Sequence, residues 1–249
     1  WWTKLALAAG LFTLLGYVSL PELAARDKKL LRWLYALAAV TSAVALVRFV
    51  LREAVPSLVA AGNDATAERA VSRLREISFL QDLMRKNALV DPDHDGIGSA
   101  ALLSELSGKT PLRGATPIDP PLLNETYSHF EDTKLGPAAQ AVGYLFVVCL
   151  PRKGGGFSAR PGDAFDEELA ERRFVAYAWP AAARHGPSEA FFIDEHERIL
   201  VSENQSGNEP RWAGPYFPPD CDAALAADTR DAWKPWRGKK PREVLPGDR

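Results

Sequence analysis

The sequence predicts an α+β protein: an N-terminal transmembrane helical hairpin, then a long amphipathic helix packed on an antiparallel sheet of about four strands. Three observations predict it. The start of the chain is mostly apolar, the next segment repeats apolar residues at helical spacing, and the second half holds short apolar runs separated by turn residues. These patterns divide the chain into a hairpin at 1–55, a globular domain at 56–209 and a Pro/Trp-rich extension at 210–249.

Two apolar stretches predict the membrane spans. Residues 1–20 carry one charge, at Lys4, and residues 30–51 carry two, both near the ends of the stretch. The short basic connector forces a hairpin and faces the cytoplasm by the positive-inside rule. Small residues that allow close helix packing in a bilayer are Gly10, Gly16, Ala39 and Ala43. A cleaved signal peptide is the alternative for the first stretch.

Charge and cysteine content limit the function further. The net charge of −2 over 249 residues lacks the basic field of a general nucleic-acid binder. The two cysteines, Cys149 and Cys221, are compatible with one disulfide in an oxidising compartment.

An amphipathic helix is predicted after a kink at Pro56 and a joint at 60–64. From Ala65 onward the apolar residues recur at helical spacing, which predicts one buried stripe. The stripe consists of Ala67, Ala70, Val71, Leu74, Ile77, Leu80 and Met84. The basic residues beside it predict a solvated face, with contact to lipid headgroups as the alternative.

Residues 91–98, DPDHDGIG, form a candidate metal site. Alternating carboxylates followed by Gly96 match the first half of an EF-hand-type calcium loop, so calcium is a candidate cofactor with a structural role. Position twelve of such a loop, where a bidentate glutamate belongs, is Leu102. An Asx-rich turn that ends the long helix is the alternative. The candidate ligands are Asp91, Asp93, Asp95, Ile97 and Ser99.

Four segments predict strands. Residues 142–150 are a nearly continuous apolar run, residues 173–179 alternate, and residues 190–193 and 198–202 flank a charged turn. Beyond residue 203 the chain reads as loop, with aromatic residues among prolines. These aromatics are candidates for partner contact, and covering their own sheet is the alternative. The candidates are Trp212, Tyr216, Trp233 and Trp236.

The order of these motifs resembles the pilin-like proteins of the planctomycete and myxobacterial kind, which join a prepilin-type helix to a small β head. Over residues 65–202 the shared motifs are DPDHDGIGSAALLSELSG, GYLFVVCLP, FVAYAWP and EAFFIDEHERIL. The resemblance implies a pilin-like roll in the periplasm, held by two spans in the bacterial inner membrane. Unlike pilins, the stretch at 30–51 has no prepilin cleavage site and no embedded glutamate. This implies a permanently anchored head.

The sequence contains no recognisable catalytic motif. Its four histidines lack HExxH spacing, and no GxSxG, Walker or dinucleotide-binding motif is present. We therefore expect a non-enzymatic accessory or scaffold subunit of a larger membrane protein complex. Its expected partners are other membrane subunits and the lipid bilayer, and no nucleic acid. The alternatives are an extracytoplasmic ligand- or calcium-binding sensor and a pseudopilin-like component of a pilus or secretion machine.

Overall fold

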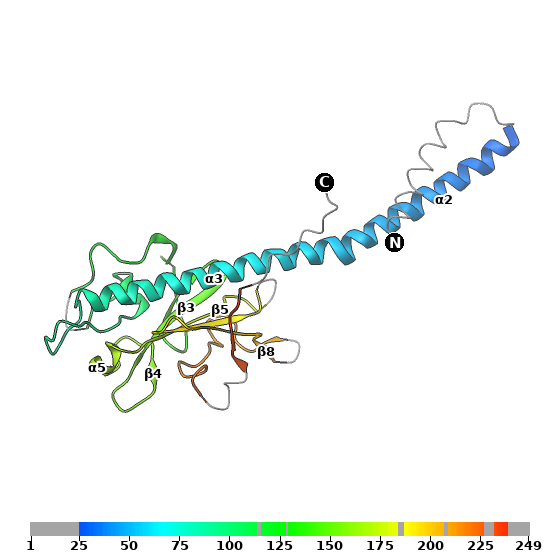
Figure 1. Cartoon of the computed structure of the whole chain (residues 1–249). Coiled ribbons are helices and arrows are strands. Elements are labelled where there is room, and N and C mark those ends of the chain that lie inside the picture. The colour runs from blue at the N-terminus through cyan, green and yellow to red at the C-terminus, as the bar shows by residue number, and fades with distance from the viewer. Residues whose placement is uncertain are drawn as a thin grey trace. The chain divides into compact units, whose positions relative to one another are not determined.

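The computed structural model describes residues 25–113, 116–127, 129–183, 187–206, 209–226 and 232–238. Its contacts divide the chain into two compact units, residues 1–62 and residues 63–249. The described part of the first unit is helical, and the second unit, which we call the head, contains the sheet (Figure 1).

In the first unit, helix α2 spans Ala25–Phe49 and a π-helical turn, η1, follows at Val50–Ala54. Helix α3 begins at Val55 and ends at Lys86, within the head. Pro56 explains the π turn, because proline has no N–H to donate to the carbonyl four residues earlier. Regular α-helical hydrogen bonding therefore gives way just before this residue.

The predicted transmembrane hairpin is wrong. In the part of the chain that the structure describes, no helix has the length and apolar character needed to cross a membrane. The uncharged stretch between Arg32 and Arg48 holds about 15 residues, roughly 22 Å of helix, whereas the hydrocarbon core is about 30 Å thick. The predicted localisation, a two-span inner-membrane protein with a periplasmic domain, depended on this hairpin and is therefore wrong as well. The first predicted span, which includes Gly10 and Gly16, lies outside the described residues.

The predicted four-stranded sheet is also wrong, because the described head contains an antiparallel sheet of 8 strands. The main strand order is β1-β2-β3-β5-β6-β7-β10, and β4 pairs with β3. The bounds are β1 Phe130–Asp132, β2 Pro137–Ala141, β3 Tyr144–Pro151, β4 Phe157–Ser158, β5 Val175–Pro180, β6 Ala190–Asp194, β7 Ile199–Ser202 and β10 Lys234–Pro235. The predicted segments correspond to β3, β5, β6 and β7. The other four strands are short and have no apolar run.

Smaller elements connect these strands. Helix α4 spans Leu103–Leu106, the 3₁₀ turn η2 spans Glu125–Tyr127 and helix α5 spans Glu167–Ala170. A separate two-stranded ribbon joins β8, Gln205–Ser206, to β9, Glu209–Pro210.

The sheet is covered on both faces, which explains why β3 is apolar along its whole length. Alternate residues of a strand point to opposite faces. Tyr144, Phe146, Val148 and Leu150 accordingly lie in a core that includes the buried stripe of α3, and all seven predicted stripe residues are buried there. Leu145, Val147 and Cys149 lie in a second core with Trp212, Cys221 and Trp233. Trp212, Cys221 and Trp233 of the predicted extension at 210–249 therefore cover the face of the sheet opposite α3, whereas Trp236 packs against the core on the α3 side. Figure 1 shows α3 along one face of the sheet.

Candidate functional site

The Asp loop, residues 91–98, starts just after the end of α3 and turns back toward it. Its tight path uses left-handed backbone at His94 (φ 63°) and at Gly96 (φ 87°). The Gly98 N–H donates to the Arg85 carbonyl at 2.9 Å. A Cβ at Gly98 would lie 2.8 Å from Ala88 Cα and 2.9 Å from the Met84 carbonyl oxygen. The loop is thus fixed against the last turn of the helix.

The turn brings three carboxylates together. One oxygen each from Asp91, Asp93 and Asp95 lie within 4.8 Å of one another. Each carboxylate also accepts backbone hydrogen bonds inside the loop, from His94 and Gly96 to Asp91, from Asp95 to Asp93, and from Ile97 to Asp95. The loop therefore has the hydrogen bonds of the predicted Asx-rich turn, with its carboxylates close enough to share one hard cation.

These contacts change the acidity of Asp91. Desolvation acts to raise the pKa of its carboxyl, but hydrogen bonds from the backbone N–H groups of Gly96 and His94 oppose it, and the pKa is lowered. Asp91 is therefore held as a carboxylate, which is the form that binds a cation.

The remaining predicted ligands lie differently. The Ile97 side chain is exposed, so only its backbone carbonyl remains as a candidate. Ser99 is fully buried, and its hydroxyl donates to the Glu167 carbonyl at 2.9 Å. Glu105, three residues beyond Leu102, accepts from the Leu102 N–H at 2.7 Å and pairs with Arg113 instead of serving the loop.

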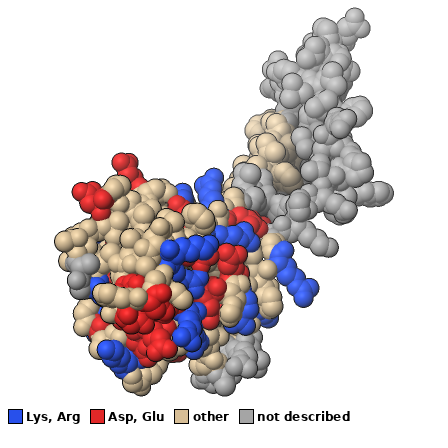
Figure 2. Space-filling view, turned by 60° about the vertical axis from the view of Figure 1, so that its left-hand side comes forward, with Lys and Arg blue, Asp and Glu red and all other residues tan. Residues whose placement is uncertain are grey.

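Sequence reasoning missed Glu171, which follows α5. This residue is 5% exposed, and its backbone carbonyl accepts from the Arg85 guanidinium at 3.2 Å. Burial raises its pKa, and the negative charges of Asp95 and Asp93 raise it further. Figure 2 shows Asp and Glu side chains gathered on one face of the head, flanked by Lys and Arg. No local spacing pointed to Glu171, because it lies far from the loop in sequence.

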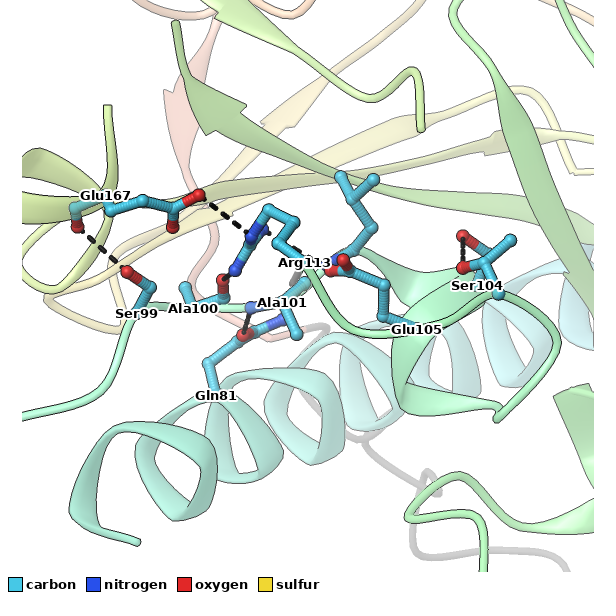
Figure 3. Close-up of polar contacts among 10 residues, drawn as sticks. Gln81, Ser99, Ala100, Ala101, Ser104, Glu105, Arg113 and Glu167 are labelled. Atoms are coloured by element: carbon cyan, nitrogen blue, oxygen red, sulfur yellow. Dashed lines mark hydrogen bonds and ion pairs between the residues drawn. The ribbon is translucent and has the colours of Figure 1, made fainter. Parts of the chain in front are cut away.

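A buried ionic cluster lies beside this region (Figure 3). The Arg113 guanidinium is 3.4 Å from a Glu105 carboxylate oxygen and 3.2 Å from one of Glu167, and it donates to the Ala100 carbonyl at 2.5 Å. The Gln81 amide of α3 bonds both backbone groups of Ala101, at 2.8 and 2.7 Å. Burial raises the pKa of Glu105, and the Arg113 charge opposes that rise. Every group here holds segments together, so we interpret the cluster as structural.

The tail aromatics divide into buried and exposed residues. Trp212 and Trp233 stack with ring centroids 5.3 Å apart and are each 6% exposed, so they cover the sheet. Trp236 packs edge-on against Phe191 at 5.2 Å. Of the four partner-contact candidates, Tyr216 is the exposed one, at 71%.

The cysteine pair is a disulfide between Cys149 on β3 and Cys221.

The charged turn after β6 is structural as well. The Asp194 carboxylate is 2% exposed, accepts the backbone N–H groups of His196 and Arg198, and pairs with the Arg198 guanidinium at 2.6 Å. His196 is largely exposed beside Glu195. This arrangement closes a hairpin and does not place an acid and a base in a cleft.

Comparison of the chain with protein-family models, curated proteins and solved structures gives no match. The resemblance to pilin-like proteins therefore stays a prediction.

The first unit carries a second candidate, an apolar surface on α2 and the adjoining turn η1. Large apolar side chains stand exposed there, including Trp33 at 77%, Leu37 at 63% and Leu51 at 64%. The small residues Ala36, Ala39 and Ala43 are exposed as well. Isolated exposed apolar residues are ordinary, but a contiguous set on one helix indicates an interaction surface.

Proposed function

We propose that this chain is a non-catalytic scaffold subunit of a larger protein assembly, and that α2 joins it to a helix of another subunit. The observation that carries the proposal is the exposed apolar surface of α2. Burying apolar surface is the dominant favourable term in protein association, and an unburied surface of this kind favours aggregation.

The spacing of this surface favours a helix as the partner. Exposed residues recur at alternating intervals of three and four, which is the heptad pattern of a helix–helix seam. The seam consists of Trp33, Ala36, Val40, Ala43 and Val47. Because Ala36 and Ala43 occupy alternate seam positions, a partner backbone can approach closely. Leu37 and Val44 add a second exposed pair, seven residues apart, which suits contact with more than one helix.

The head supports the non-catalytic part of the proposal. Its buried ionisable side chains at Arg113, Glu105 and Asp194 are used in pairs that join segments of the fold. Such pairs are typical of structural networks, in which each charge is compensated where it lies.

The proposal is tested by isolating the tagged full-length chain from gently lysed source cells and measuring the mass and composition of what accompanies it. We expect a defined assembly with stoichiometric subunits, joined through helices. Val40→Asp together with Val47→Asp places two charges in the seam and should release the chain. The matched control is Thr41→Asp, an exposed position of the same helix outside the seam.

A wild-type chain that is monomeric and without stoichiometric partners would overturn the scaffold proposal. Equal loss of the assembly in Thr41→Asp would place the contact outside the seam. In each variant, retention of the disulfide and of the thermal unfolding transition shows that the head is still folded.

A further inference from the structure

We propose that a patch on the head, made of two exposed aromatic rings and two cations, is a docking surface for an acidic segment of a partner protein. The patch consists of Lys134, Arg160, Tyr216 and Phe217, and we call it the aromatic–cationic patch. It belongs to the second unit of the chain, so the proposal goes beyond the α2 seam and does not depend on it.

The first observation is the exposure of two neighbouring aromatic side chains. Tyr216 is 71% exposed and Phe217 is 65% exposed, whereas the nearby Trp212 is buried in the cover of the sheet. A single exposed apolar residue is ordinary. Adjacent tyrosine and phenylalanine rings have the composition that is enriched in protein interfaces.

The turn that carries the rings is held in one conformation. The Ala213 N–H donates to the Phe217 carbonyl at 3.0 Å, which closes the turn. Gly214 joins the turn to β5, because its N–H donates to the Pro180 carbonyl at 2.9 Å and its carbonyl accepts from the Trp179 indole at 2.9 Å. The rings are therefore mounted on backbone that is already ordered, which lowers the entropy cost of binding through them.

The two cations reach the turn from other segments. Lys134 lies in the turn between β1 and β2, with its ammonium 5.2 Å from the centre of the Phe217 ring and its N–H donating to the Pro215 carbonyl at 3.4 Å. Arg160 follows β4 and donates from its guanidinium to the Lys134 carbonyl at 2.6 Å. Both side chains are exposed, and neither forms an ion pair with another described residue.

This combination of groups favours an acidic peptide segment with apolar side chains. Carboxylates form charge-assisted hydrogen bonds with lysine and arginine, and apolar side chains bury the rings. Charge complementarity of this kind also selects the partner and orients it. A nucleic acid fits less well, because the net charge of −2 provides no basic field around the patch.

The experiment measures binding of a fluorescein-labelled peptide of repeated Glu-Glu-Leu-Leu units to the full-length chain by fluorescence polarisation. Alternate residues of an extended peptide share a face, so each face of this repeat presents both acids and apolar groups. We expect a Kd of about 10–100 μM, which rises when NaCl is raised from about 0.05 M to about 0.5 M. A matched peptide of Gln-Gln-Leu-Leu units should bind at least about tenfold more weakly, because it lacks the charges.

Variants of the patch locate the binding. Phe217→Ser and Lys134→Glu should each weaken binding of the acidic peptide at least about fivefold. The matched controls are Phe79→Ser and Lys86→Glu, which make the same changes at exposed positions of α3, whose buried stripe lies in the other core. Both controls should leave the affinity unchanged. An unaltered thermal unfolding transition in each variant shows that the head is still folded.

Absence of binding of the acidic peptide would overturn the proposal, and equal binding of the two peptides would remove its acidic part. Equal weakening in the α3 controls would reduce the effect to general surface charge and hydrophobicity. Vesicles of phosphatidylglycerol and phosphatidylcholine test a lipid surface: binding to them that Phe217→Ser abolishes, without peptide binding, would overturn the peptide proposal. The seam variant with Val40→Asp and Val47→Asp should bind the peptide normally, which separates this proposal from the scaffold proposal.

Discussion

The hydroxyl of Tyr177, on the buried strand β5, donates a hydrogen bond of 2.9 Å to the backbone carbonyl of Cys221. It also accepts from the Ala224 N–H at 3.0 Å. Its pKa is raised, chiefly because burial disfavours the phenolate. The C-terminal cover is thus held to the sheet by this hydroxyl and by the adjacent disulfide.

Replacing Tyr177 with Phe should lower the free energy of unfolding by about 1–3 kcal/mol, because two buried backbone groups lose their partner. Urea unfolding followed by fluorescence measures the change. Tyr216→Phe is the control, since Tyr216 is 71% exposed and a surface change of this kind costs at most about 0.5 kcal/mol. Equal stability of the two variants would contradict the importance of the Tyr177 contact.

Reduction of the Cys149–Cys221 disulfide should destabilise the head by about 4 kcal/mol, because the bond closes a loop with a sequence separation of 72 residues. Calorimetry with and without a phosphine reductant measures the fall in unfolding temperature. A Cys149→Ala, Cys221→Ala double variant should unfold at the same temperature in both buffers. A wild-type transition that does not respond to complete reduction would contradict the prediction.

Arg113→Met should cost about 3–5 kcal/mol, because it leaves the buried Glu105 carboxylate without its counter-charge. Adding Glu105→Gln to this variant should recover part of the loss. The control is Arg172→Met, whose exposed ion pair with Glu168 is worth about 0–1 kcal/mol. Unfolding in urea distinguishes the outcomes, and similar losses in both arginine variants would show that burial of the pair is unimportant.

The raised pKa of Glu105 gives stability a defined pH dependence. Above its ordinary pKa of 4.5, the unfolded carboxyl ionises while the folded one retains its proton. The native state then binds more protons than the unfolded state. The contribution of Glu105 to the free energy of unfolding therefore falls as the pH rises from the ordinary pKa through the native one. Between pH 4.5 and 7, the difference in unfolding free energy between wild type and Glu105→Gln should change in that direction. Parallel curves of unfolding free energy against pH for the two proteins would contradict this prediction. Glu171 is present in both proteins, so its own pH dependence cancels in the difference.

Gly98→Ala should destabilise the head by about 1–3 kcal/mol, because the added methyl meets backbone atoms of α3 and its C-terminal turn that cannot move aside cheaply. The nearest is Ala88 Cα, 2.8 Å from the position that the new Cβ would occupy. Gly62→Ala is the control: nothing lies within 4 Å of its Cβ position, and Ala should stabilise the helix by about 0.5–1 kcal/mol. Thermal unfolding checks both signs, and a neutral Gly98→Ala would show that the loop can shift away from the helix.

Parts of the fold with a strong local pattern were predictable. The stripe from Ala67 to Met84 has clear helical spacing, and the run that became β3 is apolar throughout. Strand β2 reads PAAQA and β10 is only Lys234–Pro235, so neither has a pattern that a sequence can reveal. The apolar run in α2 was misinterpreted as a membrane span because Arg32 and Arg48 were allowed at its ends, which leaves an uncharged stretch of only about 15 residues between them.

The candidate site shows the same division. Asp91, Asp93 and Asp95 are neighbours in sequence, so their convergence was readable from their spacing. Glu171 and the Arg113 cluster depend on how α5 and the loop after α4 pack, which no local pattern encodes. Trp212 and Trp233 were candidates for partner contact because the sequence does not show the second face of the sheet that they cover.

The disulfide also governs what a protease would release. The turn at Gly154–Gly156 is exposed and lies between Cys149 and Cys221 along the chain. A single cut there would produce two fragments that stay covalently joined, so a gel without reductant would show one band at nearly the original mass. Only a gel run with reductant would reveal the nick.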